Sequence, residues 1–134
     1  MRIAFLAATA VLPVFLIQIP TQTAGGNAAR GSYLVEDVAM CVQCHSPRDE
    51  HGNLLRDRLF MGAPVPVERP RFLQDWAISA PRLAGLPGYA EEDALRLWMR
   101  GIARTGNPPR PPMPPFRLTE QDARDIYAFL KSRQ

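Results

Sequence analysis

Three stretches of the chain place apolar residues at the spacing of one helix face. The first runs from about Asn27 to Met40. No stretch alternates convincingly between apolar and polar residues with period two, so no substantial sheet is expected. The pattern therefore predicts an all-α protein. The predicted buried face of the first helix consists of Gly31, Leu34, Val35 and Val38, at positions i, i+3, i+4 and i+7.

The other two helices carry start signals as well as an apolar face. The second begins near Glu91, where three acidic residues suit the positive end of a helix dipole. The third follows Thr119, which is expected to cap a helix with Asp122 at its third position. The predicted apolar faces are Leu95, Trp98, Met99 and Ile102 in the second helix, and Ala123, Ile126, Tyr127 and Leu130 in the third.

Two loops separate these helices. The longer one spans residues 46–90, and a loop of that length in a compact domain is usually functional. The other, residues 107–115, contains six prolines in nine residues, which restrict its backbone. About 110 residues with three short helices make a thin core. We therefore expect a large apolar ligand at the centre.

The N-terminal residues predict export. Met1 and Arg2 precede an uncharged apolar run, residues 3–19, and small residues then follow up to Ala24. This order is typical of a secretory signal, so residues 1–24 are predicted to be removed and residues 25–134 to form one domain. The alternative is an uncleaved membrane anchor, since residues 3–19 as a helix reach ~25 Å of the bilayer's roughly 30 Å core. Either way, the domain is expected in the periplasm or on the outer face of the cytoplasmic membrane.

Composition and charge narrow the classes of partner. A chain of 134 residues with 46% apolar residues suits one small globular domain. Its 16 basic and 13 acidic residues give a net charge of +3 and are interspersed. Because no basic block occurs, nucleic acid is not expected as a partner.

Both cysteines lie close to one of the two histidines, as Cys41, Cys44 and His45. This CxxCH spacing is the haem c attachment motif, in which the thiols bind the haem covalently and the histidine binds the iron. A zinc site that adds His51 lacks the usual ligand spacing. A redox pair would need a βαβ context, and a disulfide closing so short a loop would stabilise little. One covalent haem c is therefore predicted.

Five side chains are candidates for the opposite side of the iron: Met40, Met61, Met99, Met113 and His51. Met40 is tethered beside the attachment site, Met99 belongs to a helix stripe, and His51 is only six residues from His45. The two loop methionines, Met61 and Met113, are better placed. A thioether is a weak ligand that loses binding free energy if its backbone is free. Prolines on both sides of Met113 restrict its backbone, so His45 and Met113 are predicted as the iron ligands.

Three segments resemble the small class I c-type cytochromes. These are "RGSYLVEDVAMCVQCHSPRD" (30–49), "APRLAGLPGY" (80–89) and "PPMPPFRLTEQDARDIYAFLKS" (111–132), so that the resemblance spans most of residues 28–133. It implies the class I cytochrome c fold, with short helices and long loops wrapped around one haem. It also implies Met113 as distal ligand, a hydrogen bond from His45 to the Pro81 carbonyl, and a contact of the first and last helices at Gly31 and Tyr127. The loop 46–79 is longer than in compact members, and the resemblance assigns it no role.

These observations predict a one-electron carrier and not an enzyme. Its expected partners are redox proteins, one donor and one acceptor. The first alternative is a haem subunit of a larger membrane-associated dehydrogenase or respiratory complex. The second is an open-site haem enzyme or gas sensor, in which Met113 does not bind the iron. Four side chains are candidates to bind the haem propionates: Arg71, Trp76, Arg82 and Arg110.

Overall fold

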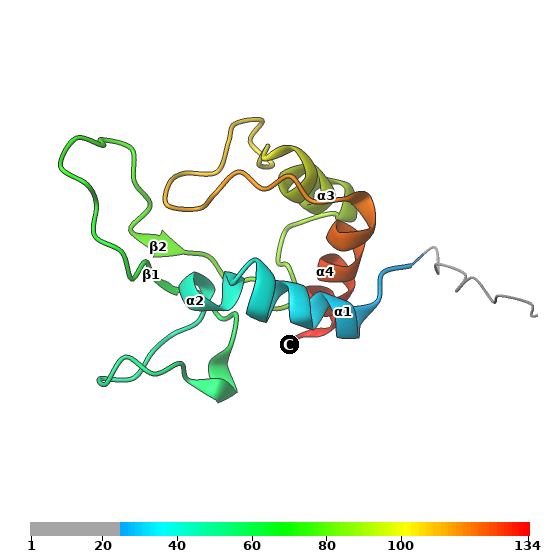
Figure 1. Ribbon diagram of the computed structural model, residues 1–134, viewed down its shortest axis with the longest axis horizontal. Helices are drawn as coiled ribbons and strands as arrows, with labels where there is room; N and C mark the ends of the chain where they lie inside the picture. Colours follow the sequence, from blue (N-terminus) through cyan, green and yellow to red (C-terminus); the bar gives the residue numbers. More distant parts are fainter. Residues whose placement is uncertain (1–24) are drawn as a thin grey trace, which may run out of the picture.

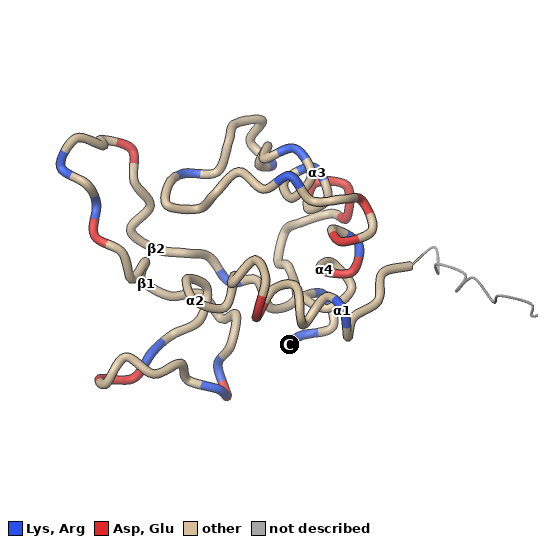
Figure 2. The backbone as a smooth tube through the Cα atoms, viewed as in Figure 1, with Lys and Arg blue, Asp and Glu red and all other residues tan. Residues whose placement is uncertain are grey.

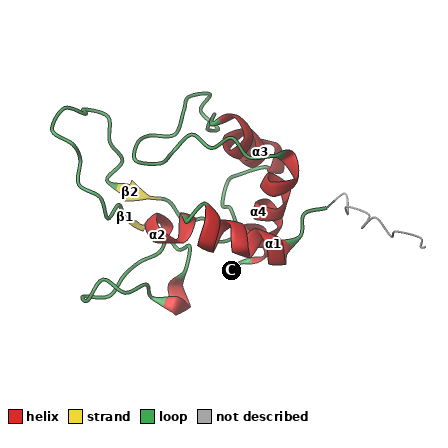
Figure 3. Ribbon diagram, viewed as in Figure 1, coloured by secondary structure: helices red, strands yellow, loops and turns green. Residues whose placement is uncertain are grey.

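The computed structural model describes residues 25–134, which are mainly helical with long loops (Figures 1 and 3). The predicted signal or anchor, residues 1–24, lies outside this described part. None of the helices from residue 25 onward is long and apolar enough to cross a membrane. The elements are α1 (Ala28–Tyr33), the π-helical turn η1 (Leu34–Val38), α2 (Cys41–His45), the 3₁₀ turn η2 (Arg56–Arg58), β1 (Ala63–Pro64), β2 (Ser79–Ala80), α3 (Glu91–Arg100) and α4 (Glu120–Ser132).

The first predicted helix is divided into two parts with different geometry. It begins as expected, because the Asn27 side chain caps α1 by accepting hydrogen bonds from two backbone N–H groups. In η1 the Ala39 N–H donates to the Leu34 carbonyl at 2.7 Å, a π-type bond. The wider turn rotates the side chains that follow it away from the face that a regular α-helix would present. The prediction that Val38 is buried is therefore wrong, and its side chain is 54% exposed.

The second and third predicted helices form α3 and α4. The α3 helix ends at Gly101, which takes the left-handed conformation with φ 64°, so Ile102 lies beyond the helix. Leu97, absent from the predicted stripe, is buried instead. The α4 cap is confirmed, since the Thr119 hydroxyl oxygen accepts a hydrogen bond from the Asp122 N–H at 3.2 Å. Tyr127 is half-buried, whereas the other three predicted residues of the α4 face are buried.

Helices α1 and α4 pack against each other at Gly31. A Cβ at this position would meet the backbone carbonyl of Asp125, with the carbonyl carbon at 2.6 Å, and the Phe129 Cβ at 2.8 Å. The predicted contact between the first and last helices is therefore confirmed at Gly31. The aromatic residue close to this glycine is Phe129, which the sequence analysis did not select.

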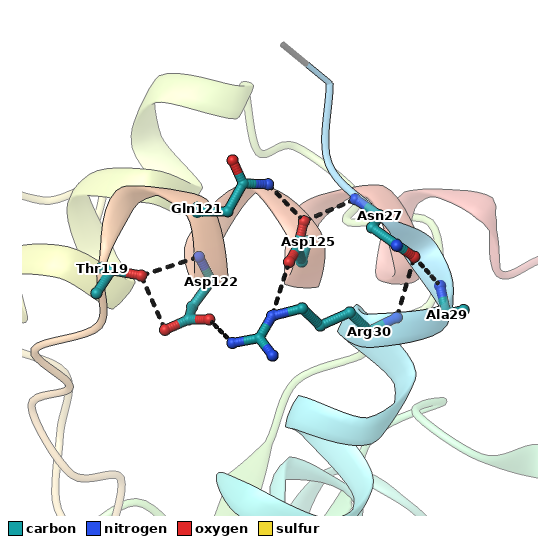
Figure 4. A network of polar contacts seen from close by, with 7 residues as sticks. All are labelled: Asn27, Ala29, Arg30, Thr119, Gln121, Asp122 and Asp125. Atoms are coloured by element: carbon teal, nitrogen blue, oxygen red, sulfur yellow. Dashed lines mark hydrogen bonds and ion pairs between the residues drawn. The ribbon is translucent and has the colours of Figure 1, made fainter. Parts of the chain in front are cut away.

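A polar network beside this contact joins the start of α1 to α4 (Figure 4). The buried Asp125 carboxylate accepts a hydrogen bond from the Asn27 N–H at 2.7 Å and one from the Gln121 side chain at 2.8 Å. Its second oxygen lies 3.1 Å from Arg30 Nε as an ion pair, and Arg30 also pairs with Asp122. A buried carboxylate that is paired and hydrogen-bonded favours one arrangement of the two helices.

The long loop contributes to the core and forms the small sheet. Phe60 is fully buried, and its ring contacts Phe129 of α4 edge to face, with centroids 5.8 Å apart. Strands β1 and β2 pair antiparallel, with Ala63 opposite Ala80. The residues between them, 65–78, project as an extended arm on the side of the molecule where the proline-rich loop also lies (Figure 1). We call residues 65–78 the arm.

Candidate functional site

Helix α2 presents both cysteines to one side. Its single turn spans Cys41–His45, and residues three apart on a helix share a face. Both thiols are free and half-buried. Burial raises the pKa of the Cys41 thiol to about 11, so this thiol is protonated at neutral pH.

His45 is held by hydrogen bonds from the long loop. Its Nδ1 lies 2.7 Å from the Pro81 carbonyl, which confirms the interaction that the family resemblance implied. Because a carbonyl only accepts, Nδ1 carries the proton and Nε2 keeps a free electron pair. Burial lowers the pKa of His45, although the Pro81 bond partly opposes this, so the ring favours the neutral form. A neutral imidazole held in this tautomer is the form that binds a metal.

The backbone around His45 is fixed by residues that the sequence analysis missed. The Gly62 N–H donates to the His45 carbonyl at 2.8 Å. The next residue, Ser46, is buried, and its hydroxyl accepts a hydrogen bond from the Phe60 N–H at 2.9 Å. These bonds form only when the long loop folds back on α2. The sequence contains no local signal for them beyond the position of Ser46 next to the motif.

A cavity of about 570 Å³ lies against this surface of α2. Cys41, Cys44, His45 and Met113 all line it, so the structure brings together the four predicted site residues from α2 and the proline-rich loop. Much of the remaining wall is apolar, including Leu83, Leu86, Leu97, Trp98 and Phe116.

The other candidate iron ligands lie elsewhere, with one exception. Met61 and Met99 pack on the hydrophobic core and are not among the residues lining the cavity. His51 is exposed and lies 3.5 Å from Glu50. Met40 lines the cavity beside Cys41, as its position in the sequence requires. From residue 25 to the C-terminus, no three His, Cys, Asp or Glu side chains gather to hold a metal ion.

Three arginines stand at the wall of the cavity: Arg82, Arg104 and Arg110. Two of them were expected as propionate partners, but Arg104 was not. Its guanidinium donates to the Gly88 carbonyl and lies 5.2 Å from the centre of the Tyr89 ring. The remaining propionate candidates, Arg71 and Trp76, do not line the cavity. No carboxylate of the described residues lines it either, so an acidic group of a ligand would meet positive but no negative side chains there.

The residues around this cavity fit a covalently attached haem. The volume lies within the range of cofactor sites, and its wall is mostly apolar. Two thiols on one helix face can form the two thioether links. An imidazole and a thioether are side chains that bind haem iron in electron-transfer proteins.

The comparison with known protein families agrees with this site. The family model described as Cytochrome c matches residues 28–134. The chain belongs to the cytochrome c family. A search of the curated proteins finds no match. The matched region begins at the first residue of α1, directly after the Asn27 cap.

Membership of the cytochrome c family confirms the predicted fold class and cofactor. The mainly helical structure, with its small two-stranded sheet, is the class I cytochrome c fold. The cofactor is haem c, bound covalently through Cys41 and Cys44 of the CxxCH motif. The protein is thus a haem c electron-transfer protein.

Proposed function

We propose that this cytochrome c is an exported one-electron carrier in which His45 and Met113 are the two iron ligands. The observation that carries the proposal is their common position. His45 from α2 and Met113 from the proline-rich loop line the same cavity. The bond from His45 Nδ1 to the Pro81 carbonyl leaves Nε2 as the nitrogen that would bind the iron.

The arrangement suits electron transfer more than bond chemistry. When bound, haem c supplies one iron that takes an electron from a donor and passes it to an acceptor. His45 and Met113 would both bind the iron and so would leave no open position for a substrate. A neutral methionine raises the reduction potential relative to a second histidine. The thioether links hold the cofactor through repeated encounters with other proteins.

The proposed partners are a donor and an acceptor protein that bind transiently. Interfaces of such redox pairs are small, with less than about 1,200 Å² buried. Acidic and basic residues are interspersed along the described backbone, including α3, α4 and the arm (Figure 2). Charge therefore identifies no single class of partner surface. One observation favours the alternative of a haem subunit in a larger dehydrogenase. Phe72 on the arm is 83% exposed, and a permanent subunit interface would cover such an aromatic side chain.

Replacing Met113 by alanine is the test of the axial ligand. A methionine sulfur bound to ferric haem gives a weak long-wavelength absorption band. We expect the oxidised wild-type protein to show this band, and the Met113→Ala variant to lose it completely. The reduced variant should also bind carbon monoxide, because its sixth position becomes open.

Met61→Ala is the matched control, since Met61 is a loop methionine outside the lining of the cavity. This variant should keep the band. If the band survived in Met113→Ala, or disappeared in Met61→Ala, the proposed ligand would be wrong. Carbon monoxide binding to the reduced wild-type protein would favour the open-site enzyme or gas sensor instead.

The proposed removal of residues 1–24 is compatible with the contacts at the start of the fold. A Cβ at Gly26 would lie 2.9 Å from the Asp125 backbone nitrogen, so this segment runs directly against α4. The Asn27 N–H donates to Asp125. Cleavage after Ala24 preserves both contacts, whereas cleavage beyond Gly26 would remove the first.

The mass of the protein isolated from its native cells tests this proposal. We expect the mass of residues 25–134 plus one haem, in the soluble periplasmic fraction. A full-length mass in the membrane fraction would instead support the anchor at residues 3–19. Isolation of that form in mild detergent with a dehydrogenase subunit bound would favour the complex over the free carrier.

A further inference from the structure

The base of the arm is bound to the histidine side of the site. The Val65 N–H donates to the Ile78 carbonyl at 3.0 Å, and the β1–β2 pair continues from there. Gly62, just before β1, donates to the His45 carbonyl, and Pro81, just after β2, accepts from His45 Nδ1. The two ends of the hairpin are thus anchored on one residue.

The second half of the arm, next to its base, is bound to the methionine side. Asp75 Oδ1 accepts from Arg110 Nε at 2.6 Å, and the Trp76 carbonyl accepts from the same guanidinium at 3.0 Å. The Ala77 N–H donates to the Pro111 carbonyl at 2.7 Å. Three consecutive residues of the arm therefore bind two consecutive residues of the proline-rich loop. These two residues, 110 and 111, stand just before Met113.

The contact continues to Met113 through a tight turn. The Met113 N–H donates to the Arg110 carbonyl at 3.2 Å. A shift of Arg110 therefore moves the backbone of Met113. The flanking prolines restrict the dihedral angles of this loop but not its position over the cavity. Contacts with another part of the molecule must determine that position.

We propose that the arm positions Met113 over the iron, with Asp75 as the principal positioning side chain. The inference rests on the proposed function, in which Met113 is the sixth ligand. It assigns a role to the part of the long loop that the family resemblance left unexplained. Without the arm, the proline-rich loop would open more often and the thioether would leave the iron more easily.

The size of the effect depends on how many contacts are removed. Asp75 and Arg110 are 69% and 61% exposed, and an exposed ion pair contributes little by itself. Asp75→Asn should therefore have a modest effect. Removing the whole arm also removes the bonds at Trp76 and Ala77, and their effects combine.

Imidazole binding to the oxidised holoprotein measures how easily Met113 leaves the iron. An arm-less variant replaces residues 66–77 by an Asn-Gly turn, which joins Val65 to Ile78 with the twist of a tight hairpin. Compared with wild type, Asp75→Asn should bind imidazole about two- to fivefold more tightly. The arm-less protein should bind it about tenfold or more tightly. Loss of the methionine–iron band during the titration reports the displacement.

Two further variants make the test specific. Asp57→Asn removes an exposed carboxylate of the same long loop that forms no ion pair within the described residues, and it should bind imidazole as wild type does. The single variants Asp75→Arg and Arg110→Asp should each bind imidazole more tightly than wild type. The double variant, in which the two charges are exchanged, should bind imidazole with an affinity close to that of wild type.

The possible outcomes distinguish the positioning role of the arm from the identity of the sixth iron ligand. If the band is present in wild type and imidazole affinity is the same in wild type, Asp75→Asn and the arm-less protein, the positioning role is overturned. If the arm-less protein does not fold, Asp75→Asn and the charge exchange still decide it. If the wild-type protein lacks the band, Met113 is not the ligand, and the proposed function is overturned together with the positioning of Met113.

Discussion

Replacing Gly31 by alanine is expected to lower the free energy of unfolding of the holoprotein by about 2 kcal/mol. Alanine is the better helix former by about 1 kcal/mol, which alone would stabilise α1. The added methyl group, however, would meet the Asp125 backbone carbonyl and the Phe129 Cβ. Backbone cannot move aside as a flexible side chain can, and such overpacking costs about 3 kcal/mol. Denaturation in guanidinium chloride, followed by circular dichroism, measures the difference.

Gly25→Ala is the matched control for this experiment. It adds the same methyl group, but no atom of the described residues, apart from those of the adjacent residue, lies within 4 Å of that position. The control should unfold at the wild-type denaturant concentration. Equal midpoints for Gly31→Ala and Gly25→Ala would show that α1 and α4 do not approach as closely in solution as in the structure.

Replacing both cysteines by alanine is expected to abolish covalent haem attachment and, with it, the folded state. The cavity of about 570 Å³ lies between α2, α3 and the loops, so without haem much of its apolar wall would face water. A domain of this size has little other apolar surface to bury. We therefore expect no haem in the Cys41→Ala/Cys44→Ala protein after acid–acetone extraction, and little cooperative unfolding.

Gln43→Ala provides the comparison, because it changes one of the two residues between the cysteines and keeps both thiols and His45. This variant should retain one covalent haem and a cooperative unfolding transition. Covalent haem in the double variant would contradict attachment through Cys41 and Cys44. A well-dispersed NMR spectrum from its haem-free chain would contradict the dependence of the fold on haem.

The helices were predicted well wherever the signal is local. The start of the first helix near Asn27, the Thr119 cap and the start of α3 depend on residues within one turn of each other, and all three are confirmed. The burial of Val38 was predicted wrongly for a related reason. A simple period of 3.6 residues cannot foresee a π-helical turn, whose extra residue rotates the next side chain away from the core.

The chemistry of attachment was likewise encoded in a short segment. Cys41, Cys44 and His45 lie in a single helical turn, so their spacing alone specifies two thioether links and one imidazole. The choice of one methionine as the second iron ligand required information from outside this segment. The prolines around Met113 indicated a restricted loop, and the fold places Met113, but neither Met61 nor Met99, at the cavity.

The sequence by itself determined the class of the protein, its cofactor and the ends of most helices, because those depend on neighbouring residues. The tertiary structure alone decided how the long loop is used. The Gly62 bond to His45, the burial of Ser46 and the contact of Asp75 with Arg110 each join residues 14 or more positions apart. Such contacts form only after the chain has closed large loops, and no local pattern specifies which residues will then meet.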